Sequence, residues 1–121
     1  MCNMKKVSVI GSGNVGASTA LLIAQRELAD VVLVDIVEGI PQGKGLDMLE
    51  SAPVDGFDSK VFGTNDYSEI RGSDIIVVTA GFPRKPGMSR LDLQKQNADI
   101  IGGISQKIAD YAPASVIIMV T

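Results

Sequence analysis

The sequence predicts a doubly wound α/β fold, in which crossover helices cover both faces of a parallel β-sheet. Short apolar runs alternate with segments of helical periodicity along the chain. The first apolar run leads directly into a glycine-rich turn, and the second ends in an acidic residue. Strands are expected near residues 6–10, 31–35, 60–63, 74–79 and 115–120, and helices near residues 14–28, 42–52 and 90–111.

Two of the expected strands contain continuous apolar runs, at residues 75–78 and 116–120. Such runs are typical of parallel strands that are buried on both faces of a sheet, so we expect both strands to be buried in this way. Right-handed crossovers between the elements favour a Rossmann-type sheet with the strand order 3-2-1-4-5.

Local sequence patterns also indicate where the helices begin and end. Pro41 suits the first turn of the second helix, and Pro53 is expected to end that helix. The third helix begins with a sequence that resembles a capping box, in which Ser89 is the N-cap and Asp92 is the third helical residue.

The third helix carries an apolar stripe at helical spacing, formed by Leu93, Ile100, Ile101, Ile104 and Ile108. Asn97 lies on the same stripe, where an amide without a partner would cost about 1–3 kcal/mol. We expect Asn97 either to bond to neighbouring backbone or to contact a cofactor or substrate. Gly102 and Gly103 each cost about 1 kcal/mol relative to alanine inside a helix. They are expected to allow close packing of backbone or ligand.

A G-x-G-x-x-G motif occupies the turn between the first strand and the first helix. Gly11 permits a tight turn, Gly13 lets the backbone approach a pyrophosphate, and Gly16 lets the helix lie close to the strand. The N-terminus of the helix offers free N–H groups and a partial positive charge to phosphates. The predicted cofactor-binding residues of this turn are Gly11, Ser12, Gly13, Asn14, Val15 and Gly16. The alternative is a glycine-rich strand–helix turn that binds no ligand.

Asp35 follows Gly16 by nineteen residues and ends the second apolar run. An acid at this place can accept hydrogen bonds from both hydroxyls of a ribose, and it would repel a 2′-phosphate. The next residue is Ile36 and not an arginine that would attract that phosphate. The sequence therefore predicts NAD, and not NADP, as the cofactor.

Composition excludes several other classes of protein. The 121 residues suit one domain, residues 1–121, that buries about two-thirds of its unfolded surface. A net charge of −3 argues against a nucleic-acid or anionic-membrane surface. The chain has no histidine, its acids are not clustered, and Cys2 is its single cysteine, so we expect neither a bound metal nor an internal disulfide. No apolar run approaches the roughly 20 residues of a membrane span.

The segment 79–90 holds three cations, Arg84, Lys85 and Arg90, in a chain that is otherwise net acidic. Its two prolines and two glycines favour a stiff, hinged loop. Each arginine can bind a carboxylate through a bidentate fork, so a substrate with two carboxylates would use both. The alternative is a solvated basic loop, which is the interpretation that we favour for Lys85.

Three segments of the chain together resemble malate dehydrogenases, and more narrowly the bacterial ones that are structurally close to lactate dehydrogenases. These segments are G-S-G-N-V-G at 11–16, D-I-V-E-G-I-P-Q-G-K at 35–44 and A-G-F-P-R-K-P-G-M-S-R at 80–90. The similarity runs along the whole chain. It implies an NAD-dependent exchange of hydride between malate and oxaloacetate.

The resemblance also implies roles for individual residues. Arg84 and Arg90 would bind the dicarboxylate, with Arg84 on its distal carboxylate. Asn97 would contact the cofactor, and Val120 and Thr121 would begin another cofactor-contacting segment. Lactate dehydrogenases usually carry an uncharged residue at the position of Arg84, so this arginine favours malate and oxaloacetate.

The family continues beyond Thr121 with an Asn-Pro turn, a sixth strand and a half that supplies a His–Asp pair and a third arginine. We therefore expect no catalytic residue in this chain, and no activity from the chain alone. The fifth strand would be an exposed edge, so we expect a marginally stable domain that associates. A different dehydrogenase design, Tyr-x-x-x-Lys, is excluded because Arg71 follows Tyr67 and Ser115 follows Tyr111 at that spacing.

The leading hypothesis is thus the NAD-binding half of a malate dehydrogenase of the tricarboxylic acid cycle. The complete enzyme would be cytoplasmic, would form a homo-oligomer and would bind neither nucleic acid nor membrane. The alternatives are a stand-alone nucleotide-binding module and the corresponding part of a lactate dehydrogenase.

Overall fold

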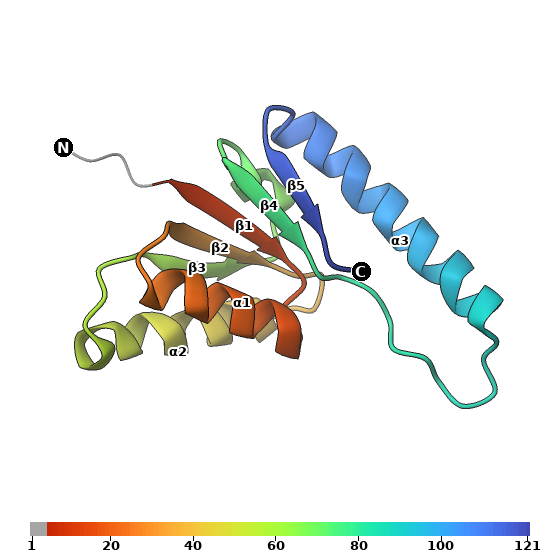
Figure 1. Cartoon of the computed structure of the whole chain (residues 1–121), viewed down its shortest axis with the longest axis horizontal. Helices are drawn as coiled ribbons and strands as arrows, with labels where there is room; N and C mark the ends of the chain where they lie inside the picture. The colour runs from red at the N-terminus through yellow and green to blue at the C-terminus, as the bar shows by residue number, and fades with distance from the viewer. Residues whose placement is uncertain (1–4) are drawn as a thin grey trace.

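The computed structural model describes residues 5–121 as a five-stranded parallel sheet with helices on both faces (Figure 1). The strands are β1 (Lys6–Ile10), β2 (Asp30–Val34), β3 (Val61–Thr64), β4 (Ile75–Val78) and β5 (Val116–Met119). The helices are α1 (Asn14–Gln25), α2 (Ile40–Asp55), α3 (Arg90–Tyr111) and a short 3₁₀ helix, η1 (Tyr67–Ile70). The strand order is β3-β2-β1-β4-β5, which confirms the predicted order. The 3₁₀ helix was not predicted, and Cys2 lies outside the described residues.

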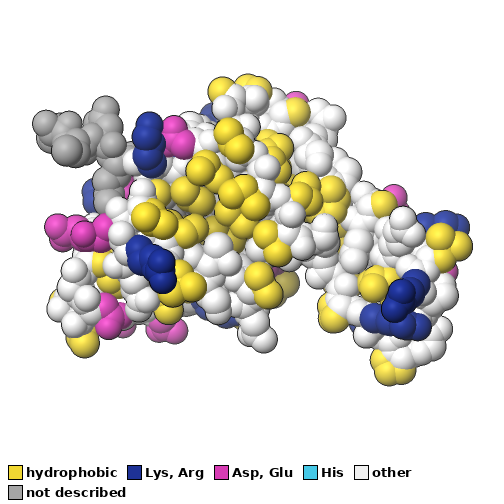
Figure 2. Space-filling view, in the orientation of Figure 1, with side chains coloured by type: hydrophobic (Ala, Val, Ile, Leu, Met, Phe, Trp, Pro, Cys, Tyr) yellow, Lys and Arg dark blue, Asp and Glu magenta, His cyan; other side chains and the backbone are white. Residues whose placement is uncertain are grey.

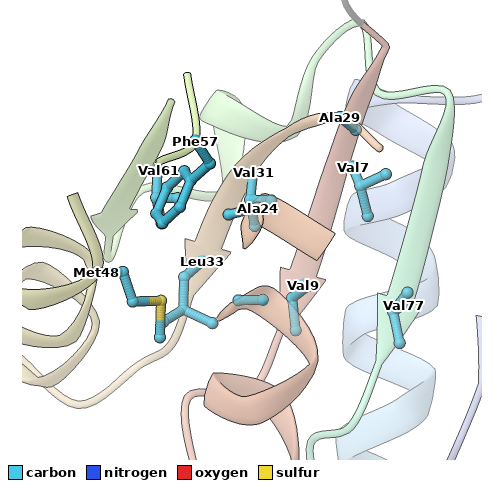
Figure 3. Close-up of a cluster of buried hydrophobic side chains, with 11 residues drawn as sticks. Val7, Val9, Ala24, Ala29, Val31, Leu33, Met48, Phe57, Val61 and Val77 are labelled. Atoms are coloured by element: carbon cyan, nitrogen blue, oxygen red, sulfur yellow. The ribbon is translucent and has the colours of Figure 1, made fainter. Parts of the chain in front are cut away.

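Side chains of the central strands alternate between two hydrophobic clusters, one on each face of the sheet. The first cluster lies under α1 and α2 and includes Val9, Leu33 and Met48 (Figure 3). The second lies under α3 and η1 and includes Val34 and Ile104. Because β1, β2 and β4 contribute to both clusters, these strands are fixed in register from both sides.

Helix α2 packs unusually closely on β3, through two glycines. A Cβ atom added at Gly63 would lie 1.7 Å from the carbonyl oxygen of Pro41, and one added at Gly45 would lie 2.6 Å from the Gly63 nitrogen. Neither position tolerates a side chain without movement of the backbone. The place of α2 relative to the sheet is therefore tightly determined.

Two predicted helix ends are wrong. Helix α2 continues through Pro53 to Asp55 and ends where Gly56 adopts the left-handed conformation, because a proline so close to the end disrupts little of the helix. Helix α1 ends at Gln25, three residues early, because Glu27 adopts a positive φ of 53°. The N–H of Leu28 then bonds to the Ile23 carbonyl in a Schellman motif.

The predicted starts of α1 and α3 are confirmed, whereas α2 begins at Ile40, two residues before the predicted residue 42. Pro41 lies in the first turn of α2. At α3 the N–H of Asp92 donates to the Ser89 hydroxyl at 3.1 Å, and the N–H of Ser89 donates to the Asp92 carboxylate at 3.3 Å. The two bonds form the capping box that the sequence indicates.

Burial of the fifth strand on both faces is a further prediction that the structure contradicts. The last three residues of β4 are buried, but all four residues of β5 are exposed, from 45% for Met119 to 63% for Val116. The reason is that β5 lies at the edge of the sheet, and neither hydrophobic cluster of the described residues extends over it. Hydrophobic side chains gather over this open part of the sheet beside α1 (Figure 2), where Ile23, Leu28 and Ile118 line a shallow groove. None of the helices in residues 5–121 has the length and apolar character needed to cross a membrane.

Candidate cofactor site at the carboxyl ends of the strands

A groove of about 510 Å³ lies where β1, β2 and β4 end, between the glycine turn and α3. Ligands of doubly wound folds bind at this place, because the strand order reverses there and leaves a crevice. The groove is lined by Ile10, Gly11, Gly13, Asp35, Ile36, Val37, Tyr67, Thr79, Ala80, Gly81, Phe82, Asp99, Ile100, Gly103, Ile104 and Lys107. Its volume falls within the range of cofactor pockets.

Gly11 and Gly16 are glycines because of the packing of the protein itself. Gly11 has a φ of +107°, and a Cβ atom there would lie 2.6 Å from the Thr79 hydroxyl oxygen. A Cβ atom at Gly16 would lie 1.8 Å from the carbonyl oxygen of Gly11. The turn and the first turn of α1 therefore touch each other with no room for a side chain.

Gly13 differs from its two neighbours in the motif. Its φ of −69° suits any residue, and a Cβ atom there would meet nothing within 4 Å. Gly13 is exposed, and its N–H donates to none of the residues that the structure describes. The fold does not require a glycine here, whereas close approach of a ligand to the backbone would. This is the place at which a diphosphate fits the site.

Asp35 is half-buried at the end of β2 and already accepts three hydrogen bonds. Its Oδ2 atom accepts from the N–H of Ser12 at 2.7 Å and from the Ser12 hydroxyl at 2.6 Å, while Oδ1 accepts from the N–H of Val37 at 3.2 Å. A carboxylate has about four acceptor positions, so the Oδ1 atom keeps one for a ligand. Burial alone would raise the pKa of Asp35, but the bonds from Ser12 and Val37 outweigh it and hold the pKa below its usual value.

Tyr67 and Lys107 form part of the groove wall, and neither was predicted from the sequence. The Lys107 ammonium lies 4.4 Å from the centre of the Tyr67 ring. Burial raises the pKa of the Tyr67 hydroxyl, and the charge of Asp35 raises it further. The two residues are far apart in the chain and meet only where η1 packs on α3, so no local pattern identifies the pair. Ile100 and Ile104, which also line the groove, were visible as part of the helical stripe.

The predicted polar contact of Asn97 is made with backbone. Its Oδ1 atom accepts a hydrogen bond from the N–H of Phe82 at 2.9 Å, which ties α3 to the segment after β4. The close backbone packing expected at Gly102 and Gly103 is not found, because nothing lies within 4 Å of a Cβ atom at either position. Gly103 instead lines the groove.

The structure does not gather all predicted site residues at the groove. Gly11, Gly13 and Asp35 line it, Ser12 lies buried behind Asp35, and Asn14 and Val15 are exposed at the start of α1. The other predicted residues also lie outside the groove lining: Gly16, which is buried in α1, and Arg84, Arg90, Asn97, Val120 and Thr121.

Arg84 and the last two residues have contacts of their own. Arg84 and Arg90 are exposed, and the Nε atom of Arg84 donates to the Met88 carbonyl at 3.1 Å within the loop. The N–H of Val120 continues the ladder to Val78, and the Thr121 hydroxyl donates to the Ala80 carbonyl at 2.6 Å.

Comparison with known proteins agrees with this geometry. Residues 5–121 match the family model of the lactate/malate dehydrogenase NAD binding domain. A malate dehydrogenase from Roseiflexus sp. (strain RS-1) is 61% identical over 115 residues, which are 95% of this chain and 37% of that protein. A malate dehydrogenase from Methanosarcina acetivorans is 53% identical over 118 residues, which are 98% of this chain and 38% of that protein. The chain thus spans less than two-fifths of the length of these relatives.

Solved structures show the same similarity. The apo form of the malate dehydrogenase from Picrophilus torridus superposes with a TM-score of 0.94 at 45% identity, over 97% of this chain and 38% of that one. A lactate dehydrogenase from Cryptosporidium parvum, in complex with lactic acid and nicotinamide adenine dinucleotide, superposes with a TM-score of 0.92 at 44% identity. That match covers 100% of this chain and 38% of the other. This chain therefore belongs to the lactate/malate dehydrogenase family, of which it carries the NAD-binding domain.

Proposed function

We propose that this chain is the NAD-binding part of a malate dehydrogenase, with the cofactor's diphosphate on Gly13 and its adenosine ribose on Asp35. The single observation that carries the cofactor assignment is Gly13, a glycine with open space around it and an N–H that has no partner among residues 5–121. Asp35 supports the assignment, because its Oδ1 atom keeps one acceptor position for a ribose hydroxyl.

For the substrate we propose malate and oxaloacetate, which carry two carboxylates. Arg84 lies within a loop whose residues are nearly all exposed, and Arg90 lies at its end, so both guanidinium groups remain available to carboxylates. Lactate and pyruvate have a single carboxylate and would leave one arginine unpaired. The malate dehydrogenases that are 53–61% identical to this chain support the same assignment, and the lactate dehydrogenase from Cryptosporidium parvum is less similar, at 44% identity.

NAD supplies the hydride acceptor of such a reaction when it is bound. The described residues bind and orient: Gly13 at the diphosphate, Asp35 at the ribose, and the loop 82–90 as a cover that excludes water from the charged contacts. No histidine is present to exchange the proton of the hydroxyl, so that group would come from outside these residues. We further propose that the complete enzyme is a cytoplasmic homo-oligomer, a location that the single cysteine suits.

The substrate assignment is tested in a chimera, in which residues 1–121 replace the matching part of the malate dehydrogenase from Bacillus subtilis, a relative that is 58% identical. We expect Arg84→Gln to lower kcat/KM for oxaloacetate and to relax the preference toward pyruvate. Lys85→Gln removes a neighbouring charge from the same loop and is the matched control. An Arg84→Gln chimera with an unchanged oxaloacetate-to-pyruvate ratio of kcat/KM would refute the assignment.

A second function, a nucleotide-binding module without activity, describes the 121 residues when they are alone. The observation in its favour is again the absence of histidine from the sequence. An assay of the purified chain with oxaloacetate and NADH distinguishes this inactive module from an active dehydrogenase. Turnover by the chain alone would show that it holds a proton donor that we have not identified, and the module description would then be wrong.

A further inference from the structure

We propose that Lys44 is a positioning residue of the cofactor site, and that it directs the Gly13 N–H toward the bound diphosphate. The inference rests on the proposed placement of NAD. Lys44 lies in α2, far along the chain from the glycine turn, and its Nζ atom donates to the carbonyl oxygen of Ser12 at 2.6 Å. It is half-buried and does not line the groove.

Ser12 is held from two sides. Its N–H and its hydroxyl both donate to the Asp35 carboxylate, and its carbonyl accepts from Lys44. Ser12 is 1% exposed, so water does not compete for these groups. Every polar group of this residue is therefore used, and the residue has little freedom to rotate.

The direction of the Ser12 carbonyl determines the direction of the next N–H. The carbonyl of Ser12 and the N–H of Gly13 belong to one planar peptide, and no described peptide bond is cis. In a trans peptide the two groups point in opposite directions. By binding the carbonyl, Lys44 turns the Gly13 N–H away from α2. That N–H has no partner in the described part of the chain, and it belongs to the glycine at which a ligand has room.

Lys44 can act in this way because α2 itself is fixed. Gly45, its immediate neighbour, packs against the backbone of Gly63, and Gly63 packs against Pro41 at the start of the same helix. These backbone contacts leave α2 little room to slide on β3. The ammonium group is thus attached to a rigid support, as a positioning group must be.

The experiment is a calorimetric titration of the chain with ADP and, separately, with adenosine. We expect Lys44→Met to weaken ADP binding by about tenfold, because the Gly13 N–H is no longer held toward the diphosphate. Adenosine has no phosphate, so its affinity is expected to change by less than about twofold. Lys44→Arg retains a donor and is expected to bind ADP within about threefold of the unaltered chain.

Two controls separate positioning from a simple effect of charge. Lys60→Met removes the same charge just before β3, at the opposite end of the sheet, and is expected to bind ADP normally. Salt screens a direct attraction between Lys44 and phosphate, so a loss that vanishes at about 1 M salt would identify charge as the cause and overturn the proposal. If Lys44 acts by positioning, the tenfold ratio of ADP affinities between the unaltered chain and Lys44→Met persists at this salt concentration. The amide resonance of Gly13 in the ligand-free protein is expected to shift in Lys44→Met and not in Lys60→Met.

The affinities of the unaltered chain and of Lys44→Met distinguish an error about Lys44 from an error about the cofactor site. If the unaltered chain binds ADP and Lys44→Met binds it equally well, Lys44 has no positioning role and the cofactor site stands. If the two ligands weaken equally in Lys44→Met, the lysine supports the fold of the site as a whole, and the proposal is wrong. If the unaltered chain binds neither ADP nor adenosine, the cofactor assignment and the role of Lys44 both fail.

Discussion

The Oδ2 oxygen of Asp35 accepts two hydrogen bonds from Ser12, one from its backbone N–H at 2.7 Å and one from its hydroxyl at 2.6 Å. This pair connects the end of β2 to the glycine turn, so the residue expected to bind ribose also holds the turn expected to bind diphosphate. One carboxylate oxygen serves the protein, and the other keeps an acceptor position for the cofactor.

The Asp35–Ser12 pair predicts how stability depends on pH. The pKa of Asp35 is lowered on folding, so its ionised form stabilises the folded chain. This contribution is fully present above the ordinary pKa of 3.8 and is lost as the pH falls through the lower pKa of the folded state. We expect Asp35→Asn to be less stable than the unaltered chain near neutral pH. Urea unfolding at several pH values should show that this difference shrinks below about pH 4. A difference that grows as the pH falls would contradict the sign of the pKa shift.

Substitution of two glycines of the turn is expected to have opposite effects on stability and on cofactor binding. Gly16→Ala forces a Cβ atom to 1.8 Å from the Gly11 carbonyl oxygen, so we expect a loss of stability of about 3 kcal/mol or more. Gly13→Ala meets no atom within 4 Å and is expected to cost about 1 kcal/mol or less. Gly13→Ala should nevertheless bind NADH far more weakly, because its methyl group occupies the space of the diphosphate. A stable Gly13→Ala chain with normal NADH affinity would rule out Gly13 as the diphosphate contact.

The capping box of α3 predicts a stability change away from the groove. Ser89→Ala removes the hydroxyl that accepts from the N–H of Asp92, and such losses cost about 0.5–2 kcal/mol. Thermal unfolding measures the effect directly. Ser89→Asp restores an acceptor and serves as the control. If both variants unfold like the unaltered chain, the capping box contributes nothing to the stability of α3.

The exposed edge strand predicts association. All four residues of β5 are exposed and apolar, and the unpaired edge of β5 is free to pair with another strand. We expect sedimentation of the purified chain to show oligomers that increase with concentration. Ile118→Lys places a charge in the apolar groove beside α1 and is expected to reduce them. A monomer at every concentration would show that the edge does not drive association.

The strand order could be predicted because it depends on features that a sequence displays directly. Apolar runs locate the strands, helical periodicity locates the crossovers, and the right-handed rule then leaves few topologies. The capping box could also be predicted from the sequence, since its two residues are three positions apart in the chain. The end of α1 could not be predicted, because Glu27 adopts a conformation that usually requires glycine.

Features that depend on contacts between distant segments could not be predicted in this way. Gly45 and Gly63 lie in different elements, and only their packing shows why neither has a side chain. Lys107 contacts the ring of Tyr67 in the wall of the groove, and Lys44 in α2 donates a hydrogen bond to the carbonyl of Ser12 in the glycine turn. The sequence predicted Gly13 and Asp35 as cofactor contacts, because the spacing of the motif matches the geometry of a dinucleotide, and both residues line the groove.

Calorimetric titration with NADH and with NADPH tests whether Gly13 and Asp35 make this chain an NAD-selective domain. We predict saturable binding of NADH, with NADPH weaker by at least about tenfold, or about 1.4 kcal/mol, because Asp35 repels the 2′-phosphate. Equal or tighter binding of NADPH would contradict the role of Asp35. Binding of neither nucleotide would contradict the claim that these residues form a cofactor site.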